Sequence, residues 1–218
     1  MYTNVNLAAP VAVLAFLGTG FILLVASIVL VQSLIVRKRG RTRLLLVVML
    51  DVALAYLAAM VIFSLVSRDQ LLARGQEKHF CELDCHLAYS IANVAQAKTL
   101  SEGDSQARAQ GQFTIITIKT RFDETTIGPR RGDGLLFPNG RLFTLIDDRG
   151  NRYVPTAQAG TPVTKPLRPG ETYTTDLAFD LPTSAKPAVL LLNESAWETH
   201  LLIGHENSLL HGQTKFQI

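Results

Sequence analysis

The first 36 residues of this 218-residue chain contain no ionised side chain. The basic n-region of a cleavable signal peptide is therefore missing, and the apolar run after residue 7 is longer than such a peptide requires. We expect this segment to stay in the protein. The chain also lacks a glycine-rich phosphate-binding loop, a serine elbow between strand and helix, and an internal repeat. These absences give no support to a nucleotide-binding enzyme or a serine hydrolase.

Two long apolar runs are present near the N-terminus. Residues 8–36 are broken only by small or uncharged polar side chains, and residues 44–66 contain one ionised group, Asp51. Each run exceeds the roughly 20 residues that a helix needs to cross the hydrocarbon of a bilayer. The sequence therefore predicts a transmembrane helical hairpin in residues 1–67, with helices at about 8–36 and 44–66.

A basic loop at 37–43 separates the two runs. Short basic loops stay in the cytoplasm, so both chain ends should lie outside it. The sequence pI near 9.0 largely reflects this loop, and we do not take it as a sign of nucleic-acid binding. We expect a bacterial inner-membrane protein with a periplasmic C-terminal domain. The basic residues that set this topology are Arg37, Lys38, Arg39, Arg41 and Arg43.

Asp51 lies about 10 Å inside the second run, measured from its cytoplasmic end. A carboxylate at that depth costs a few kcal/mol unless it faces protein or is protonated. Ala55, Ala58 and Ala59 follow at helical spacing and would allow close helix contact. We expect Asp51 to face the first helix or a partner subunit, with a proton path as the alternative. Polar residues at the same depth on the first helix are Ser27, Gln32 and Ser33.

The remainder of the chain reads as a polar juxtamembrane stalk at 68–85 followed by a β domain at 86–218. Short segments rich in β-branched and aromatic residues alternate with Gly, Pro and Asp turn signals, and few stretches are helical. Seven or eight short strands of this kind predict a β-sandwich. The expected strands are 86–94, 112–122, 141–147, 151–154, 172–182, 188–192, 198–203 and 215–218.

Four segments of this domain occur in an order that resembles the immunoglobulin-like domains of bacterial lipoproteins and membrane anchors. They are GQFTIITI at 111–118, FTLIDDRGNRY at 143–153, LRPGE at 167–171 and LAFDLP at 177–182. The resemblance implies an all-β immunoglobulin-like sandwich that follows the helical hairpin. It implies no single activity, because such domains are mostly adhesive, structural or ligand-presenting.

The two cysteines, Cys81 and Cys85, lie between the expected stalk and the first strand. Two thiols this close normally oxidise outside the cytoplasm, so a structural disulfide is our preferred interpretation. The alternative is a copper or zinc site, because His79 and His86 flank the pair and thiolates with imidazoles suit these metals. The four side chains would converge only from a loop, since helical spacing puts the cysteines and the histidines on different faces.

The Cys-x3-Cys spacing with flanking histidines also resembles the copper loop of cytochrome oxidase subunit II, which likewise has a two-helix hairpin before an extracytoplasmic β domain. Here the loop precedes the domain and no Met follows as a ligand. A widened haem c attachment motif with His86 as axial ligand is disfavoured, because no distal ligand is evident. A weaker metal candidate near the C-terminus consists of His200, His205, His211 and Glu206.

No convergent catalytic set emerges, and we expect a protein that is not an enzyme and needs no cofactor. The leading hypothesis is a membrane-anchored accessory or scaffold subunit whose sandwich binds a partner protein, in a respiratory or photosynthetic membrane complex. The expected partners are the lipid bilayer and other subunits of that complex, without nucleic acid. The alternative is a copper-handling or electron-transfer protein that uses His79, Cys81, Cys85 and His86.

Overall fold

The computed structural model describes residues 2–5, 7, 9–81, 86–102, 105–126 and 132–218. The chain forms two compact units. The sandwich unit comprises Met1–Asn4, Asp69–Ala196 and Gln213–Ile218, and the hairpin unit comprises Val5–Arg68 and Trp197–Gly212. Each unit therefore combines segments that lie far apart in the sequence.

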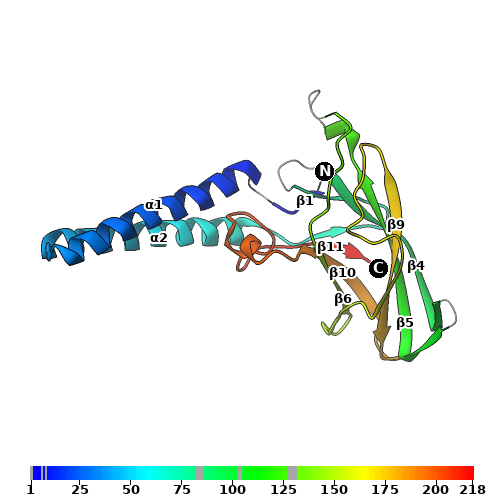
Figure 1. The fold of residues 1–218 in the computed structure, drawn as a ribbon. Helices are drawn as coiled ribbons and strands as arrows, with labels where there is room; N and C mark the ends of the chain where they lie inside the picture. Colours follow the sequence, from blue (N-terminus) through cyan, green and yellow to red (C-terminus); the bar gives the residue numbers. More distant parts are fainter. Residues whose placement is uncertain (1, 6, 8, 82–85, 103–104, 127–131) are drawn as a thin grey trace. The chain divides into compact units, whose positions relative to one another are not determined.

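The hairpin unit contains two helices, α1 (Ala9–Ile35) and α2 (Arg39–Val66), of 27 and 28 residues. At 1.5 Å per residue each is about 40 Å long, and both are apolar enough to cross a membrane. They run side by side from a short connecting turn (Figure 1). The turn is shorter than the predicted loop, because α2 begins at Arg39. Arg39, Arg41 and Arg43 are good helix formers, and α2 begins with them although Gly40 is a weak one.

The sandwich unit contains two sheets, which Figure 1 shows with their labelled strands. The six-stranded sheet has the order β1 (Tyr2–Thr3), β3 (Lys78–Phe80), β4 (Leu87–Glu102), β5 (Ser105–Phe122), β9 (Thr172–Leu181) and β8 (Ala157–Gly160). The five-stranded sheet has the order β2 (Gln70–Leu72), β11 (Thr214–Gln217), β10 (Pro187–Glu194), β6 (Arg141–Asp147) and β7 (Arg152–Tyr153). Two apolar helices followed by a two-sheet β-sandwich confirm the predicted fold class.

One apolar core joins the two sheets. On β6, Phe143 and Leu145 point inward between more exposed neighbours, the alternation expected of a strand with one covered face. Phe80 and Tyr89 meet edge to face with ring centroids 5.3 Å apart. The ammonium of the buried Lys78 donates to the carbonyl oxygens of residues 192 and 214 at 2.7 and 3.1 Å. Lys78 thereby ties β3 to two strands of the other sheet.

The N-terminus is part of the sandwich. β1 pairs in parallel with β3, with Tyr2 opposite Lys78. The side chain of Asn4 donates to Glu194 Oε1 at 2.7 Å and accepts from the backbone N–H of Cys81 at 3.1 Å. The chain leaves this unit after Asn4 and returns at residue 69. Two helices joined by a short turn bring the chain back to the end where it started, which is the condition that this pairing requires.

Three segments fold differently from the sequence-based predictions. The described part of the predicted stalk in the sandwich unit, residues 69–81, contains β2 and β3, which pair with β11 and β4, whereas residues 82–85 lie outside the described residues. The described residues between the expected strands 86–94 and 112–122 continue the β4–β5 hairpin. The expected strand 198–203 instead begins with a 3-10 helix, η2 (Trp197–Leu201), in the hairpin unit. Strands of three residues show too little periodicity to recognise, and their partners lie far along the chain.

Candidate functional site

A buried network of charged side chains lies where β3, β4 and β5 meet. β3 supplies His79, and the end of β5 leads to Asp123; His79 Nε2 is 3.1 Å from Asp123 Oδ2. Arg121 Nη2 lies 3.2 Å from the same carboxylate oxygen. The Arg121 guanidinium also donates two hydrogen bonds to Glu77, at 2.8 and 2.7 Å. Arg121 thus contacts both Glu77 and Asp123, and Asp123 also contacts His79.

Local chain geometry fixes the Asp123 carboxylate. Its Oδ1 accepts hydrogen bonds from the backbone N–H and the hydroxyl of Thr125, at 3.1 and 2.7 Å, at the start of the 3-10 helix η1 (Glu124–Thr126). Burial acts to raise the pKa of Asp123, but the hydrogen bonds from Thr125, His79 and Arg121 outweigh it and hold the pKa well below its usual range. The carboxylate is therefore ionised at neutral pH and orients the His79 ring.

The sequence-predicted cluster is only partly described. His86 Nδ1 lies 2.5 Å from Thr126 Oγ1, and its ring stacks on Phe122, so the two histidines face different partners. Cys81 is buried, whereas Cys85 lies outside the described residues. Among the described residues, no group of three His, Cys, Asp or Glu side chains is arranged to hold a metal. The disulfide, metal and haem hypotheses all stay predictions.

The weaker metal candidate near the C-terminus consists mostly of buried side chains. His205, Glu206 and His211 are buried in the hairpin unit, and only His200 is exposed. His205 Nδ1 accepts from the N–H of Asn207 at 3.0 Å, and His211 Nδ1 lies 2.6 Å from the Gly212 carbonyl oxygen. These rings have local backbone partners, so the described contacts are those of a folded loop.

Asp51 does not face the first helix, which corrects one of the two expected orientations. Its side chain is exposed, and Ser27 donates within its own helix to the Leu23 carbonyl oxygen at 2.7 Å. Gln32 is exposed, and the hydroxyl of the buried Ser33 has no hydrogen-bond partner among the described residues. The less exposed positions of α2 recur every three or four residues, and Asp51 lies about 100° away from this face. They include Leu45, Met49, Val52, Tyr56 and Met60.

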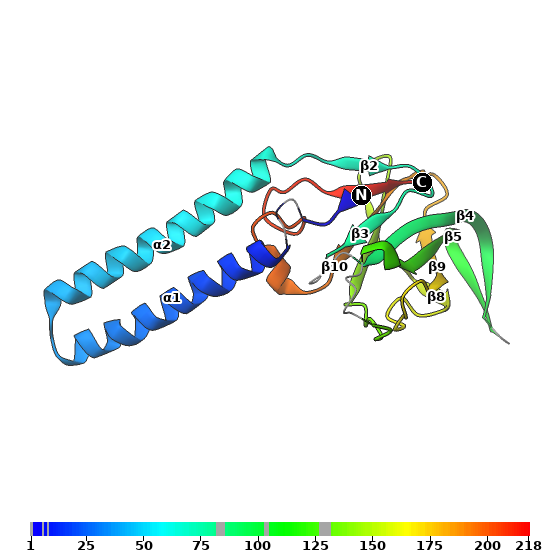
Figure 2. The same cartoon turned by 90° about the horizontal axis from the view of Figure 1, so that it is seen from above.

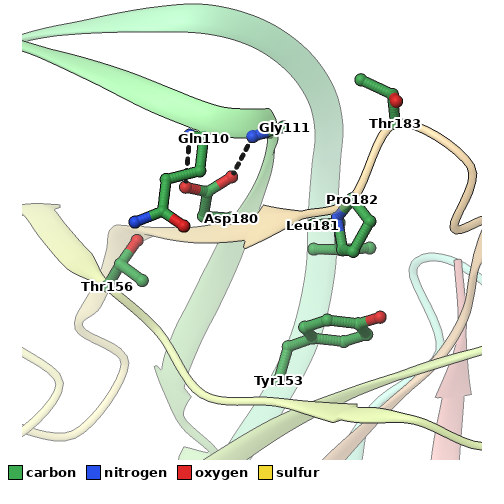
Figure 3. Close-up of a pocket in the computed structure, with 8 residues that line it drawn as sticks. All are labelled: Gln110, Gly111, Tyr153, Thr156, Asp180, Leu181, Pro182 and Thr183. Atoms are coloured by element: carbon green, nitrogen blue, oxygen red, sulfur yellow. Dashed lines mark hydrogen bonds between the residues drawn. The ribbon is translucent and has the colours of Figure 1, made fainter.

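A hollow of about 640 Å³ opens on the sandwich unit (Figure 3). The Asp180 carboxylate at its edge accepts from the backbone N–H groups of Gln110 and Gly111, at 2.7 and 3.1 Å. Tyr153 also lines it, and its hydroxyl donates to Asp147 at 3.0 Å. A Cβ on Gly111 would lie 2.0 Å from a backbone oxygen, so only glycine fits. The polar groups of Asp180 and Tyr153 are thus engaged in hydrogen bonds within the sandwich unit.

The outer face of the five-stranded sheet carries several apolar side chains among its polar ones. Leu190 and Leu192 of β10 belong to the core, so Val189 and Leu191 point outward. Val189 pairs with Ile146 of β6, and Leu191 pairs with Lys215, whose neighbour on β2 is residue 71. Leu71 on β2 is 63% exposed, and Leu142 on β6 is 55% exposed. The apolar face, as we call it, consists of Leu71, Leu142, Ile146, Val189 and the largely covered Leu191, with Thr144 and Asn193 on the same side.

Two solved structures resemble this chain, whereas no protein-family model and no curated protein matches it. One is a secreted protein from Mycobacterium tuberculosis, MPT63, at 14% sequence identity and a TM-score of 0.42. The match covers 69% of this chain and 98% of the MPT63 chain. The other is an uncharacterized β-sandwich protein from Clostridium difficile 630, at 10% sequence identity and a TM-score of 0.40. The match covers 70% of this chain and 95% of the Clostridium difficile chain.

The class of this protein rests on its own elements: it is a β-sandwich protein with two N-terminal apolar helices, of a membrane-anchored or secreted kind. Neither neighbour is described as a lipoprotein or an oxidase subunit. The resemblances to those families therefore stay predictions.

Asp123, Arg121 and Glu77 were not predicted as site residues. The segment Asp123–Thr126 does carry a local signal, because Asp followed by Thr two residues later is typical of a capped turn. The contact with His79 depends on strand pairing across 44 residues, which local patterns do not reveal.

Proposed function

We propose that this chain is a non-enzymatic, membrane-anchored accessory subunit whose sandwich unit binds an integral membrane protein in a respiratory or photosynthetic complex. The observation that carries the proposal is the apolar face. An antiparallel sheet with one solvated side normally carries polar residues on that side. Here Leu71 and Leu142 are 63% and 55% exposed, and Val189 pairs with Ile146 on the same side of the sheet.

Exposed apolar patches on folded domains mark interaction sites. The apolar face is formed by regular strands of the sheet, so it is a rigid surface that a partner meets without reordering. Lys215 crosses it but pairs with Asp69 at 2.5 Å. A flat, apolar and rigid surface of this kind suits a folded protein better than a small molecule.

The position of Asp51 supports a partner that also spans the membrane. Its carboxyl group is exposed on the side of α2 away from the α1 contact, and Ala55 and Ala58, one and two turns further on, are exposed too. A carboxylate facing acyl chains costs a few kcal/mol, whereas a neighbouring helix can approach small residues closely and supply a donor. The partner proposed here therefore contributes a transmembrane helix.

Native electrophoresis of gently solubilised membranes tests the proposal, with mass spectrometry of the band that contains this chain. We expect a band larger than the 23.9 kDa chain, with one integral membrane protein in constant ratio. Leu142→Glu should reduce this association about 30-fold, because truncating or charging a central interface residue costs about 2 kcal/mol.

Phe137→Glu is the matched control, because Phe137 is 65% exposed but lies outside the apolar face. It should leave the association unchanged. Migration of the wild-type chain alone, or equal loss of partner in the two variants, would contradict the proposed binding surface.

A further inference from the structure

Residues 197–212 connect β10 to β11 but belong to the hairpin unit, and we call them the return loop. In this loop several polar side chains are buried, whereas several apolar side chains are exposed. Thr199, His205, Glu206, Ser208 and His211 are buried, each less than 9% exposed. The side chains that are exposed are mostly large and apolar, although water favours the opposite arrangement. They are Trp197, Leu201, Leu209 and Leu210, at 66, 37, 63 and 66%.

The backbone of the return loop bonds largely to itself. The N–H groups of Leu202, His205, Ser208 and His211 each donate to the carbonyl oxygen three residues earlier. The Asn207 side chain adds a hydrogen bond to the Thr199 hydroxyl at 2.7 Å. A backbone polar group without a partner costs several kcal/mol in hydrocarbon. These hydrogen bonds therefore lower the cost of placing the loop at the boundary of the bilayer.

Three contacts fix the return loop to the helices. The Tyr56 hydroxyl donates to the Leu201 carbonyl oxygen at 2.6 Å, and the N–H of Gly212 donates to Ser67 Oγ at 2.6 Å. A β-bridge joins Val5 to His205. Figure 2 shows the loop, in orange, beside the ends of α1 and α2 that are remote from their connecting turn. Its position along the helices is thus defined.

The contact with Tyr56 gives the depth. Tyr56 lies about 18 Å along α2 from Leu44 and about 25 Å from Arg39, at 1.5 Å per residue. The hydrocarbon is about 30 Å thick, and its cytoplasmic boundary lies between these two residues if the arginines extend to the headgroups. Leu201 is then roughly 5 to 12 Å inside the opposite boundary. Interfacial helices insert their apolar faces to about 5–10 Å.

We propose that the return loop inserts its apolar side chains into the outer leaflet, so that its partner is the acyl chain and headgroup boundary of the bilayer. This inference rests on the membrane anchoring in the proposed function. Trp197 suits that boundary because indole is apolar with one polar N–H, and the exposed Glu198 and His200 beside it reach the headgroups. The chain then touches the membrane with a third element besides its two helices.

An apolar hollow beside Leu201 supports the same partner. It has a volume of about 270 Å³ and lies between α1 and α2, lined by residues that include Phe16, Gly20, Leu57 and Met60. A Cβ at Gly20 would meet no atom within 4 Å, so the hollow is open at that point. At this depth in the bilayer, a lipid acyl chain occupies the apolar hollow.

Trp197 is the only tryptophan of the chain, so its fluorescence reports on the return loop without any substitution. The full-length protein is reconstituted into phosphatidylcholine vesicles that contain lipids brominated at shallow or deep acyl positions. We expect blue-shifted emission and loss of most of the signal with the shallow bromines, and little quenching by aqueous acrylamide.

Two reporters of equal exposure calibrate the result in the Trp197→Phe background. Phe21 in α1 and Phe137 in the sandwich unit are 66% and 65% exposed, against 66% for Trp197. Phe21→Trp should be quenched most by deep bromines, and Phe137→Trp by acrylamide alone.

Water-exposed emission from Trp197, while Phe21→Trp is still quenched by lipid, would overturn the insertion of the return loop and leave the anchoring intact. Loss of lipid quenching at both positions would overturn the anchoring and the inference together.

Discussion

Within the charged network of Glu77, His79, Arg121 and Asp123, Asp123 is the residue whose removal should cost the sandwich unit most. Its carboxylate receives contacts from Thr125, His79 and Arg121 at 2.7 to 3.2 Å. Asp123→Ala removes all of these acceptors while the buried imidazole stays in place. Breaking a buried charged pair by deleting one partner costs about 3–5 kcal/mol.

The lower end of that range applies here, because the Arg121 side chain is 28% exposed and keeps its contact with Glu77. A loss of about 3 kcal/mol lowers the Tm of a domain of this size by about 10 °C. Thermal unfolding of the full chain in detergent, followed by near-ultraviolet circular dichroism, measures it. Asp69→Ala is the control, because Asp69 is 59% exposed and its surface pair with Lys215 contributes about 1 kcal/mol or less.

The pH dependence provides an independent check. Since the pKa of Asp123 is held below its usual value near 4, the network stabilises the folded state above that pH, and the contribution is lost as the pH falls further. The Tm difference between wild type and Asp123→Ala should therefore be full at pH 7 and should narrow below about pH 4. Equal Tm losses in Asp123→Ala and Asp69→Ala, or a difference that does not change with pH, would refute this reasoning.

The remaining predictions concern topology, assembly and the cysteines. With both native cysteines replaced by serine, Arg39→Cys should react with a membrane-impermeant thiol reagent only after the cytoplasmic side is opened; labelling of intact cells would reverse the topology. Asp51→Leu should insert normally but lose the partner in native electrophoresis, and an unchanged band would remove the role assigned to Asp51. Cys81 and Cys85 should be oxidised in mass spectra taken without reductant, and their replacement should lower stability by about 2 kcal/mol or less because the closed loop is short. Free thiols with stoichiometric copper or zinc would instead favour the metal-handling alternative.

Local patterns in the sequence determined the elements that repeat over many residues. The runs at 8–36 and 44–66 predict the two helices, because about 20 apolar residues in succession have few other stable structures. The alternation in 141–147 and 172–182 predicts β6 and β9, since side chains of a strand alternate between faces. These signals depend only on neighbours in the chain.

Tertiary structure decided every feature that depends on distant pairing. β1 joins the sandwich because Tyr2 meets Lys78 after two helices, and β2 forms because Thr214 lies opposite Gln70. Helical spacing placed Asp51 and the alanines on one face, but only the packing of α2 on α1 showed that this face points away. In the return loop the sequence likewise predicted a strand, at 198–203. The loop's burial pattern arises from contacts with Tyr56 and Ser67 more than a hundred residues earlier, a separation that no local periodicity encodes.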